Sequence, residues 1–156
     1  MYDELTEIDI RKMQEEIDYR MRVVRPKCIE DLKTARGFGD LSENAEYDEA
    51  KAEEARVYGR IAELENTLRS AVFVDDSKAS TDAVAVGTVV RVLDLEFDEE
   101  EEYTIVGFTE ADPMKLFISQ ESPIGGALVG SHVGDVVEVK TPGGMVQLKV
   151  LEIRRR

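Results

Sequence analysis

The stretch GFGDLSENAEY, residues 37–47, separates two runs of regularly spaced apolar residues and decides the fold of the first half of the chain. Within each run the steps are mostly three or four residues, which is typical of helices packed along a seam. The first run comprises Ile10, Met13, Ile17, Met21, Val24, Cys28, Leu32 and Ala35, and the second comprises Tyr47, Ala50, Val57, Ile61, Leu64, Leu68 and Ala71. Because a short glycine-containing turn joins them, the sequence predicts an antiparallel α-helical hairpin, about 40 Å long at 1.5 Å per residue.

Two local signals predict where the first helix begins and where it is distorted. Thr6 followed by Asp9 has the spacing of an N-terminal capping pair. Pro26 lies within the apolar run, where it has no N–H to donate and its ring crowds the preceding turn. We therefore expect the helix to begin near Thr6 and to be distorted near Pro26.

The composition changes near residue 75. The later half holds most of the glycines and prolines, and five β-rich runs lie at residues 84–92, 103–108, 115–119, 135–140 and 146–153. Thr141-Pro142-Gly143-Gly144 predicts a hairpin turn, and Ser122-Pro123 predicts the start of a short helix that stops at Gly130. The sequence thus predicts an α+β protein, with a helical hairpin over residues 1–75 and a small antiparallel sheet over residues 76–156.

Charge restricts the classes of function. The 156 residues include 34 Asp and Glu against 20 Lys and Arg, a net charge of −14 that the two halves share evenly. Such a chain does not suit general binding to duplex DNA, which depends on neutralising phosphates. With no secretory signal and no apolar run near the roughly 20 residues of a membrane span, we expect a cytoplasmic protein that requires no membrane.

Several side chains have an ordinary structural interpretation. The single cysteine, Cys28, cannot form an intrachain disulfide and is expected in the core. His132 is expected in a loop or at a sheet edge, and residues 154–156, all arginine, at a solvated terminus. The acidic run of residues 94–102 is expected to form a surface loop.

Two carboxylates near the turn are candidates for metal binding. Asp40 and Glu43 are three residues apart, so on a helical turn they would share a face and could hold a hard cation such as Mg²⁺. The same spacing also suits a capping box at the start of the second helix. Spacing alone leaves both interpretations open.

The run Gly39–Tyr47 resembles the signature of the bacterial Gre factors, which promote transcript cleavage by RNA polymerase. The later half carries a second matching set, comprising Ser122-Pro123-Ile124-Gly125, Ala127-Leu128, Gly130, Gly134-Asp135, Val137 and Thr141-Pro142-Gly143-Gly144. Together the two sets cover nearly the whole chain in the family's order and spacing. The resemblance implies an N-terminal coiled coil followed by an FKBP-like domain without prolyl isomerase activity.

For function, the resemblance implies that the coiled coil enters the secondary channel of RNA polymerase and acts on the 3′ end of backtracked nascent RNA. Asp40 and Glu43 would be the catalytic pair and would share a second Mg²⁺ with the polymerase, which cleaves the RNA itself. The chain alone would not be an enzyme. We expect a monomer that reads no specific DNA sequence.

The resemblance also assigns supporting residues. Arg36 and Lys51 match basic positions and are candidates for RNA contact, although they could equally be solvated helix charges. Asn44 and Tyr47 are expected to support the tip geometry, although Tyr47 also fits the helical core. Ser122, Pro123 and Ile124 match the polymerase-docking segment, or form an ordinary helix start.

Two other functions remain open from sequence. The first is a Gre-like regulator that occupies the secondary channel without promoting cleavage, although the intact Asp40 and Glu43 argue against it. The second is an acidic coiled-coil chaperone or scaffold for basic clients, which would not explain the tip signature.

Overall fold

The computed structural model describes residues 4–37 and 44–156, which fall into two compact units. The helical unit covers Ile10–Ala71, and the sheet unit covers Val72–Arg156 together with Glu4–Asp9. The sheet unit therefore contains a segment from the beginning of the chain, which the change in composition near residue 75 does not indicate.

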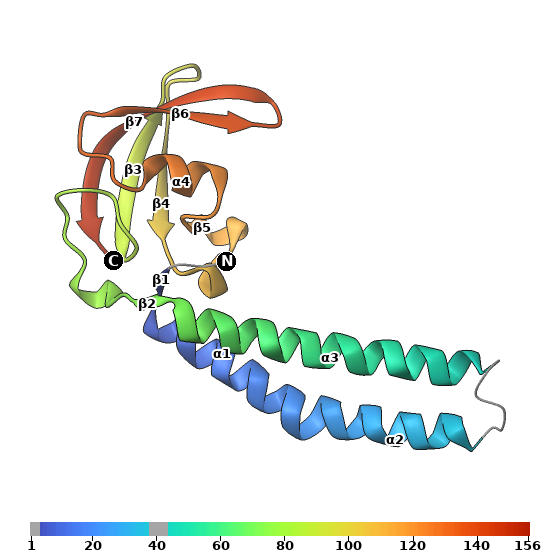
Figure 1. Ribbon diagram of the computed structural model, residues 1–156. Helices are drawn as coiled ribbons and strands as arrows, with labels where there is room; N and C mark the ends of the chain where they lie inside the picture. Colours follow the sequence, from blue (N-terminus) through green and yellow to red (C-terminus); the bar gives the residue numbers. More distant parts are fainter. Residues whose placement is uncertain (1–3, 38–43) are drawn as a thin grey trace. The chain divides into compact units, whose positions relative to one another are not determined.

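The helical unit consists of α1 (Glu7–Tyr19), a π-helical segment (Arg20–Val24), α2 (Arg25–Arg36) and α3 (Ala45–Ser70). The expected cap is confirmed, because Thr6 Oγ1 accepts the Asp9 N–H at 3.2 Å and an Asp9 carboxylate oxygen accepts the Thr6 N–H at 3.1 Å. Helices α2 and α3 lie side by side in Figure 1.

The buried faces of these helices follow the predicted runs with one exception. Met13, Leu32, Ala35 and Leu64 are buried, and Cys28, Val57 and Ile61 form a core cluster with Ile17 and Val24 packed against it. The expectation for Met21 is wrong, because its side chain is 43% exposed. Met21 lies in the π-helical segment, whose wider turn moves side chains out of the phase of an α-helix.

The sheet unit is built on a five-stranded sheet of order β5-β4-β3-β7-β6. The strands are β3 (Thr88–Asp94), β4 (Glu99–Ile105), β5 (Phe117–Ile118), β6 (Val136–Thr141) and β7 (Gly144–Arg155). The prediction of an antiparallel sheet is wrong at one edge, where β5 pairs parallel to β4. The connection between Ile105, at the end of β4, and Phe117, at the start of β5, is long enough for β5 to run in the same direction as β4.

The expectation that the acidic run of residues 94–102 forms a surface loop is wrong in part. Residues 99–102 belong to β4 rather than to a loop. Strand pairing neutralises part of their repulsion, since Arg91 pairs with Glu100 at 3.0 Å and Arg154 pairs with Glu102. Arg91 lies on the adjacent strand β3 and Arg154 on β7, the strand beyond β3, so the run is stable as a strand only once the sheet forms.

The remaining elements complete the sheet unit. Helix α4 (Pro123–Leu128) starts at the predicted cap, where Ser122 Oγ accepts the Gly125 N–H at 3.0 Å. The predicted β6–β7 turn is also confirmed, with Thr141 paired to Gly144. A separate two-stranded parallel sheet joins β1 (Glu4–Leu5) to β2 (Val72–Phe73).

Candidate functional site

The described ends of α2 and α3 meet at the predicted tip of the hairpin. Asn44 caps α3, because its Oδ1 accepts the Tyr47 N–H at 3.0 Å. Its Nδ2 also donates to the Ala35 carbonyl in the last turn of α2, at 2.6 Å. One side chain therefore satisfies a helix-start donor and a helix-end acceptor, both of which lack partners within their own helices.

A cationic contact lies beside this cap. The Arg36 guanidinium lies over the Tyr47 ring, 5.9 Å from its centroid, which is within the range of a cation–π contact. Arg36 is exposed and Tyr47 is half-buried. Both residues thus lie beside the Asn44 cap, and sequence reasoning gave no indication that Arg36 contacts the ring.

The two candidate metal ligands, Asp40 and Glu43, lie outside the described residues. Within residues 4–37 and 44–156, no group of three or more His, Cys, Asp or Glu side chains could hold a metal ion. Two carboxylates suit Mg²⁺ and would leave its remaining coordination positions to water, substrate and a partner.

The surface near the tip is acidic on one side. A groove of about 500 Å³ runs between α2 and α3, with small side chains and four carboxylates in its lining. Its lining residues are Asp31, Thr34, Ala35, Ala45, Glu46, Glu49, Ala50 and Glu53. Lys51, the second candidate for RNA contact, is exposed and pairs with Glu54 at 3.4 Å, a surface contact that an anionic ligand could replace at little cost.

The second candidate segment lies at the start of α4. Pro123 is exposed, while Ser122 and Ile124 are partly buried. Ile124 lines a cavity of about 210 Å³ between α4 and the sheet, whose lining combines apolar side chains with carboxylates from β3 and β4. The other lining residues are Val92, Asp94, Glu99, Glu101, Tyr103, Val139, Thr141, Val146 and Leu148.

One titratable group of this cavity is strongly perturbed. Burial raises the pKa of Tyr103, and the hydrogen bond that its hydroxyl donates to Glu101 raises it further. Tyr103 therefore stays protonated and acts as a hydrogen-bond donor. His132 is exposed and lies outside the strands, as expected, with its N–H donated to Asp135.

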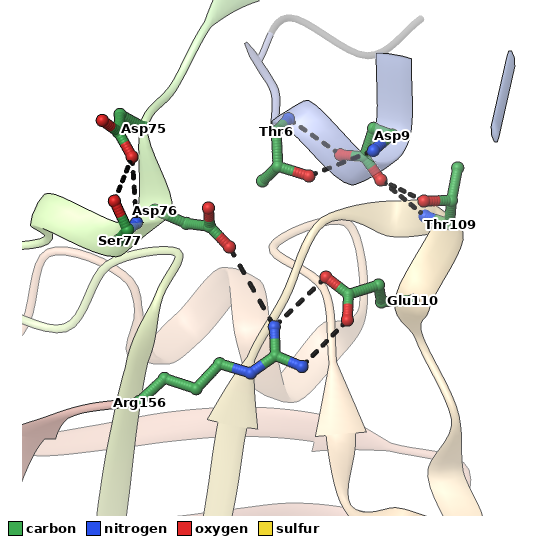
Figure 2. Close-up of polar contacts among 8 residues, drawn as sticks. All are labelled: Thr6, Asp9, Asp75, Asp76, Ser77, Thr109, Glu110 and Arg156. Carbon is green, nitrogen blue, oxygen red and sulfur yellow. Dashed lines mark hydrogen bonds and ion pairs between the residues drawn. The ribbon is translucent and has the colours of Figure 1, made fainter. Parts of the chain in front are cut away.

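Sequence reasoning missed a polar cluster in the sheet unit, drawn in Figure 2. The Asp9 carboxylate is fully buried and accepts hydrogen bonds from the Thr109 N–H and hydroxyl as well as from Thr6. Arg156 pairs with both oxygens of Glu110, at 3.2 and 2.9 Å. Residues 154–156 are exposed, as expected for a solvated terminus, and each also binds an acceptor elsewhere in the unit.

Family models match both halves of the chain. A model described as "Transcription elongation factor, N-terminal" matches residues 4–72, and one described as "Transcription elongation factor, GreA/GreB, C-term" matches residues 79–155. The chain belongs to the GreA/GreB family of transcription elongation factors.

Two relatives named GreA support this assignment. The chain is 55% identical over 146 residues to transcription elongation factor GreA of Clostridium perfringens, covering 94% of this chain and 92% of the relative. It is 50% identical over 151 residues to GreA of Acetivibrio thermocellus, covering 97% and 95%. A crystal structure of GreA factor homolog 1 (Gfh1) of Thermus thermophilus matches 99% of both chains, with 27% identity and a TM-score of 0.44.

Proposed function

We propose that this protein enters the secondary channel of RNA polymerase with its helical hairpin and stimulates the polymerase to cleave backtracked nascent RNA. The observation that carries the proposal is the match of both halves to the GreA/GreB family, together with relatives named GreA at 50–55% identity. Cleavage would release the extruded 3′ segment and allow elongation to resume.

The tip would supply the chemistry. Asp40 and Glu43 would hold a second Mg²⁺ jointly with the polymerase, and that ion would stabilise the attacking and leaving oxygens of the phosphodiester. Arg36 and Lys51 would contact RNA phosphates, while Asn44 and Tyr47 would support the tip. Because the chain would supply only part of the metal site, we expect no hydrolysis of RNA by the protein alone.

The sheet unit would dock on the polymerase. We propose an FKBP-like fold for it and docking through Ser122, Pro123 and Ile124. The exposed Pro123 and the partly apolar cavity beside Ile124 support a docking surface there. We expect the factor to act as a monomer in the cytoplasm, and none of the helices in the described part of the chain is long and apolar enough to cross a membrane.

The decisive test is cleavage in a stalled, backtracked elongation complex. Asp40→Asn and Glu43→Gln should each abolish stimulated cleavage while leaving polymerase binding unchanged, because they remove charge without changing size. Ile124→Asp should lose both binding and cleavage. Asp48→Asn, an exposed position in the first turn of α3, is the matched control and should behave as wild type.

Two outcomes would contradict the proposal. Full cleavage by the Asp40→Asn, Glu43→Gln double variant would exclude the proposed metal ligands. RNA that stays uncut with the wild-type protein at every Mg²⁺ concentration, despite binding, would identify a non-cleaving channel regulator instead.

A further inference from the structure

The chain between Gly37 and Asn44 carries both proposed metal ligands, and the described residues on either side of it are tied together. The first tie is the Asn44 amide, whose Nδ2 donates to the Ala35 carbonyl at 2.6 Å while its Oδ1 accepts the Tyr47 N–H at 3.0 Å. A side-chain amide carries its donor and its acceptor on separate atoms, so it can bind the ends of two helices at once. Aspartate could cap α3 equally well but has no donor for the Ala35 carbonyl.

The second tie uses the neighbouring position on α2. Arg36 follows Ala35 and lies over the ring of Tyr47, the residue whose N–H is bound by Asn44. The two ties therefore link consecutive residues of α2 to the first turn of α3. We call Ala35, Arg36, Asn44 and Tyr47 the tip clasp.

We propose that the tip clasp holds the ends of α2 and α3 at a fixed separation, and that Asn44 and the Arg36–Tyr47 pair are thereby positioning residues for Asp40 and Glu43. The inference rests on the proposed function. A metal site that is completed by a second protein requires its ligands to be held close to the productive geometry. A displacement of about 1 Å can lower a rate roughly 100-fold, so fixing the chain ends affects the rate directly.

Within the tip clasp, Arg36 has a role other than RNA contact. As an RNA contact, Arg36 would act through its positive charge alone, and lysine would replace it. As part of the tip clasp, it acts through the planar guanidinium over the ring, which lysine reproduces poorly. Arg36→Lys therefore separates the two roles.

The central variant is Asn44→Asp in the full-length protein. Aspartate keeps the acceptor for the Tyr47 N–H, so the α3 cap survives, but it has no donor for the Ala35 carbonyl. The matched control is Asn66→Asp, which makes the same chemical change on α3, where the Asn66 side chain is exposed and accepts from Arg69 at 2.9 Å.

The expected result is a loss of rate without a loss of binding. In the stalled elongation complex, Asn44→Asp should lower the maximal rate of stimulated cleavage roughly 10- to 100-fold and raise the Mg²⁺ concentration needed for half-maximal rate. The factor concentration for half-maximal effect and the Tm should stay at wild-type values. Tyr47→Phe, which keeps the ring, should retain the rate, whereas Tyr47→Ala and Arg36→Lys should lower it.

Wild-type rate and Mg²⁺ dependence in Asn44→Asp would overturn the proposal, as would an equal loss in Asn66→Asp. Hydrogen exchange of the Asn44 side-chain amide, measured by NMR on the free protein, tests the tip clasp apart from cleavage. Exchange slower than at Asn66 supports the bond to Ala35, and equal exchange contradicts it. A wild-type protein that stimulates no cleavage yet shows slow exchange at Asn44 would refute the proposed function and leave the tip clasp in place.

Discussion

Asp9 is a fully buried carboxylate whose partners come from two distant parts of the sheet unit's sequence. It caps the first turn of α1 through Thr6 and also accepts from Thr109, 100 residues later. Gly107 lies directly against it, and a Cβ at that position would fall 2.0 Å from an Asp9 carboxylate oxygen. The backbone of Gly107 is ordinary, with φ −64°, so glycine is needed here for space rather than for conformation.

Gly107→Ala should therefore destabilise the protein by about 2–5 kcal/mol, because the methyl group displaces a buried charge from its donors. The measurement is urea unfolding followed by circular dichroism. Gly59→Ala is the matched control, since a Cβ there meets nothing within 4 Å and should stabilise α3 by up to about 1 kcal/mol. In an Asp9→Ala background the Gly107→Ala penalty should largely disappear, and simple additivity of the two changes would contradict this account.

At this scale, sequence predicts local polar pairs better than distant ones. Thr6 with Asp9 and Ser122 with Gly125 are three residues apart, so spacing alone reveals both caps. Arg156 with Glu110 is a pair 46 residues apart, and only the completed fold brings it together.

Among the elements, the π-helical segment Arg20–Val24 explains how α1 and α2 accommodate a proline. In it the Arg25 N–H donates to the Arg20 carbonyl, five residues back. Pro26, which has no N–H, then follows at the start of α2. The sequence predicted a distortion at Pro26, but not that a wider turn would absorb it and turn Met21 toward solvent.

A second feature at this scale is the ion pair between α1 and α3, in which Glu16 accepts two hydrogen bonds from Arg60, at 3.0 and 3.1 Å, and one from Arg20. The bonds from Arg60 and Arg20 lower the pKa of Glu16 from its ordinary value of 4.5, against the opposing effect of burial. The stabilisation is therefore complete above pH 4.5 and is lost as the pH falls through the lower, folded-state pKa.

Glu16→Gln should lower the stability of the helical unit by about 0.5–1 kcal/mol at pH 7, since the pair is partly solvated. The difference from wild type should shrink as the pH falls from 5 toward about 3. Thermal unfolding followed by helical ellipticity across this range measures it, with Glu15→Gln as the exposed neighbouring control. A difference that grows on acidification would contradict the assignment.

In the described part of the molecule, the two units differ in the size of their largest core clusters. The sheet unit has a large cluster that includes the fully buried Val90, Ile105 and Val150, whereas a smaller cluster in the helical unit comprises Cys28, Val57 and Ile61. Burial of apolar area is the main source of folding free energy, so the units should differ in their ability to fold alone.

A fragment of residues 72–156 should unfold cooperatively on heating, at a lower Tm than the sheet unit of the whole protein because it lacks Glu4–Asp9. A fragment of residues 10–71 should show reduced helicity and a broad transition. Circular dichroism melts of both fragments provide the measurement. A cooperative transition in residues 10–71 together with an unfolded residues 72–156 would be the contrary result.

The sequence predicts the α+β class and most helices and strands because hydrophobic period and turn residues are local signals. It does not predict the parallel edge strand β5 or the placement of Glu4–Asp9 in the sheet unit, since both depend on contacts made across the completed fold. For the candidate site, Asp40 and Glu43 stay predictions. The bridge from Asn44 to Ala35 needs the geometry of two helices, which no spacing in the sequence encodes.

The strand order has a consequence for synthesis on the ribosome. Strand β7 lies between β3 and β6, yet it is the last of the five strands to be made, and β6 joins the sheet through it. As the nascent chain emerges, β3 can pair with β4. The other edge of β3 stays unpaired, and β6 has no adjacent strand to bind until β7 is made. The five-stranded sheet can therefore close only after β7 has left the exit tunnel, and during that interval the nascent protein presents an unpaired, valine-rich edge to the cell's chaperones.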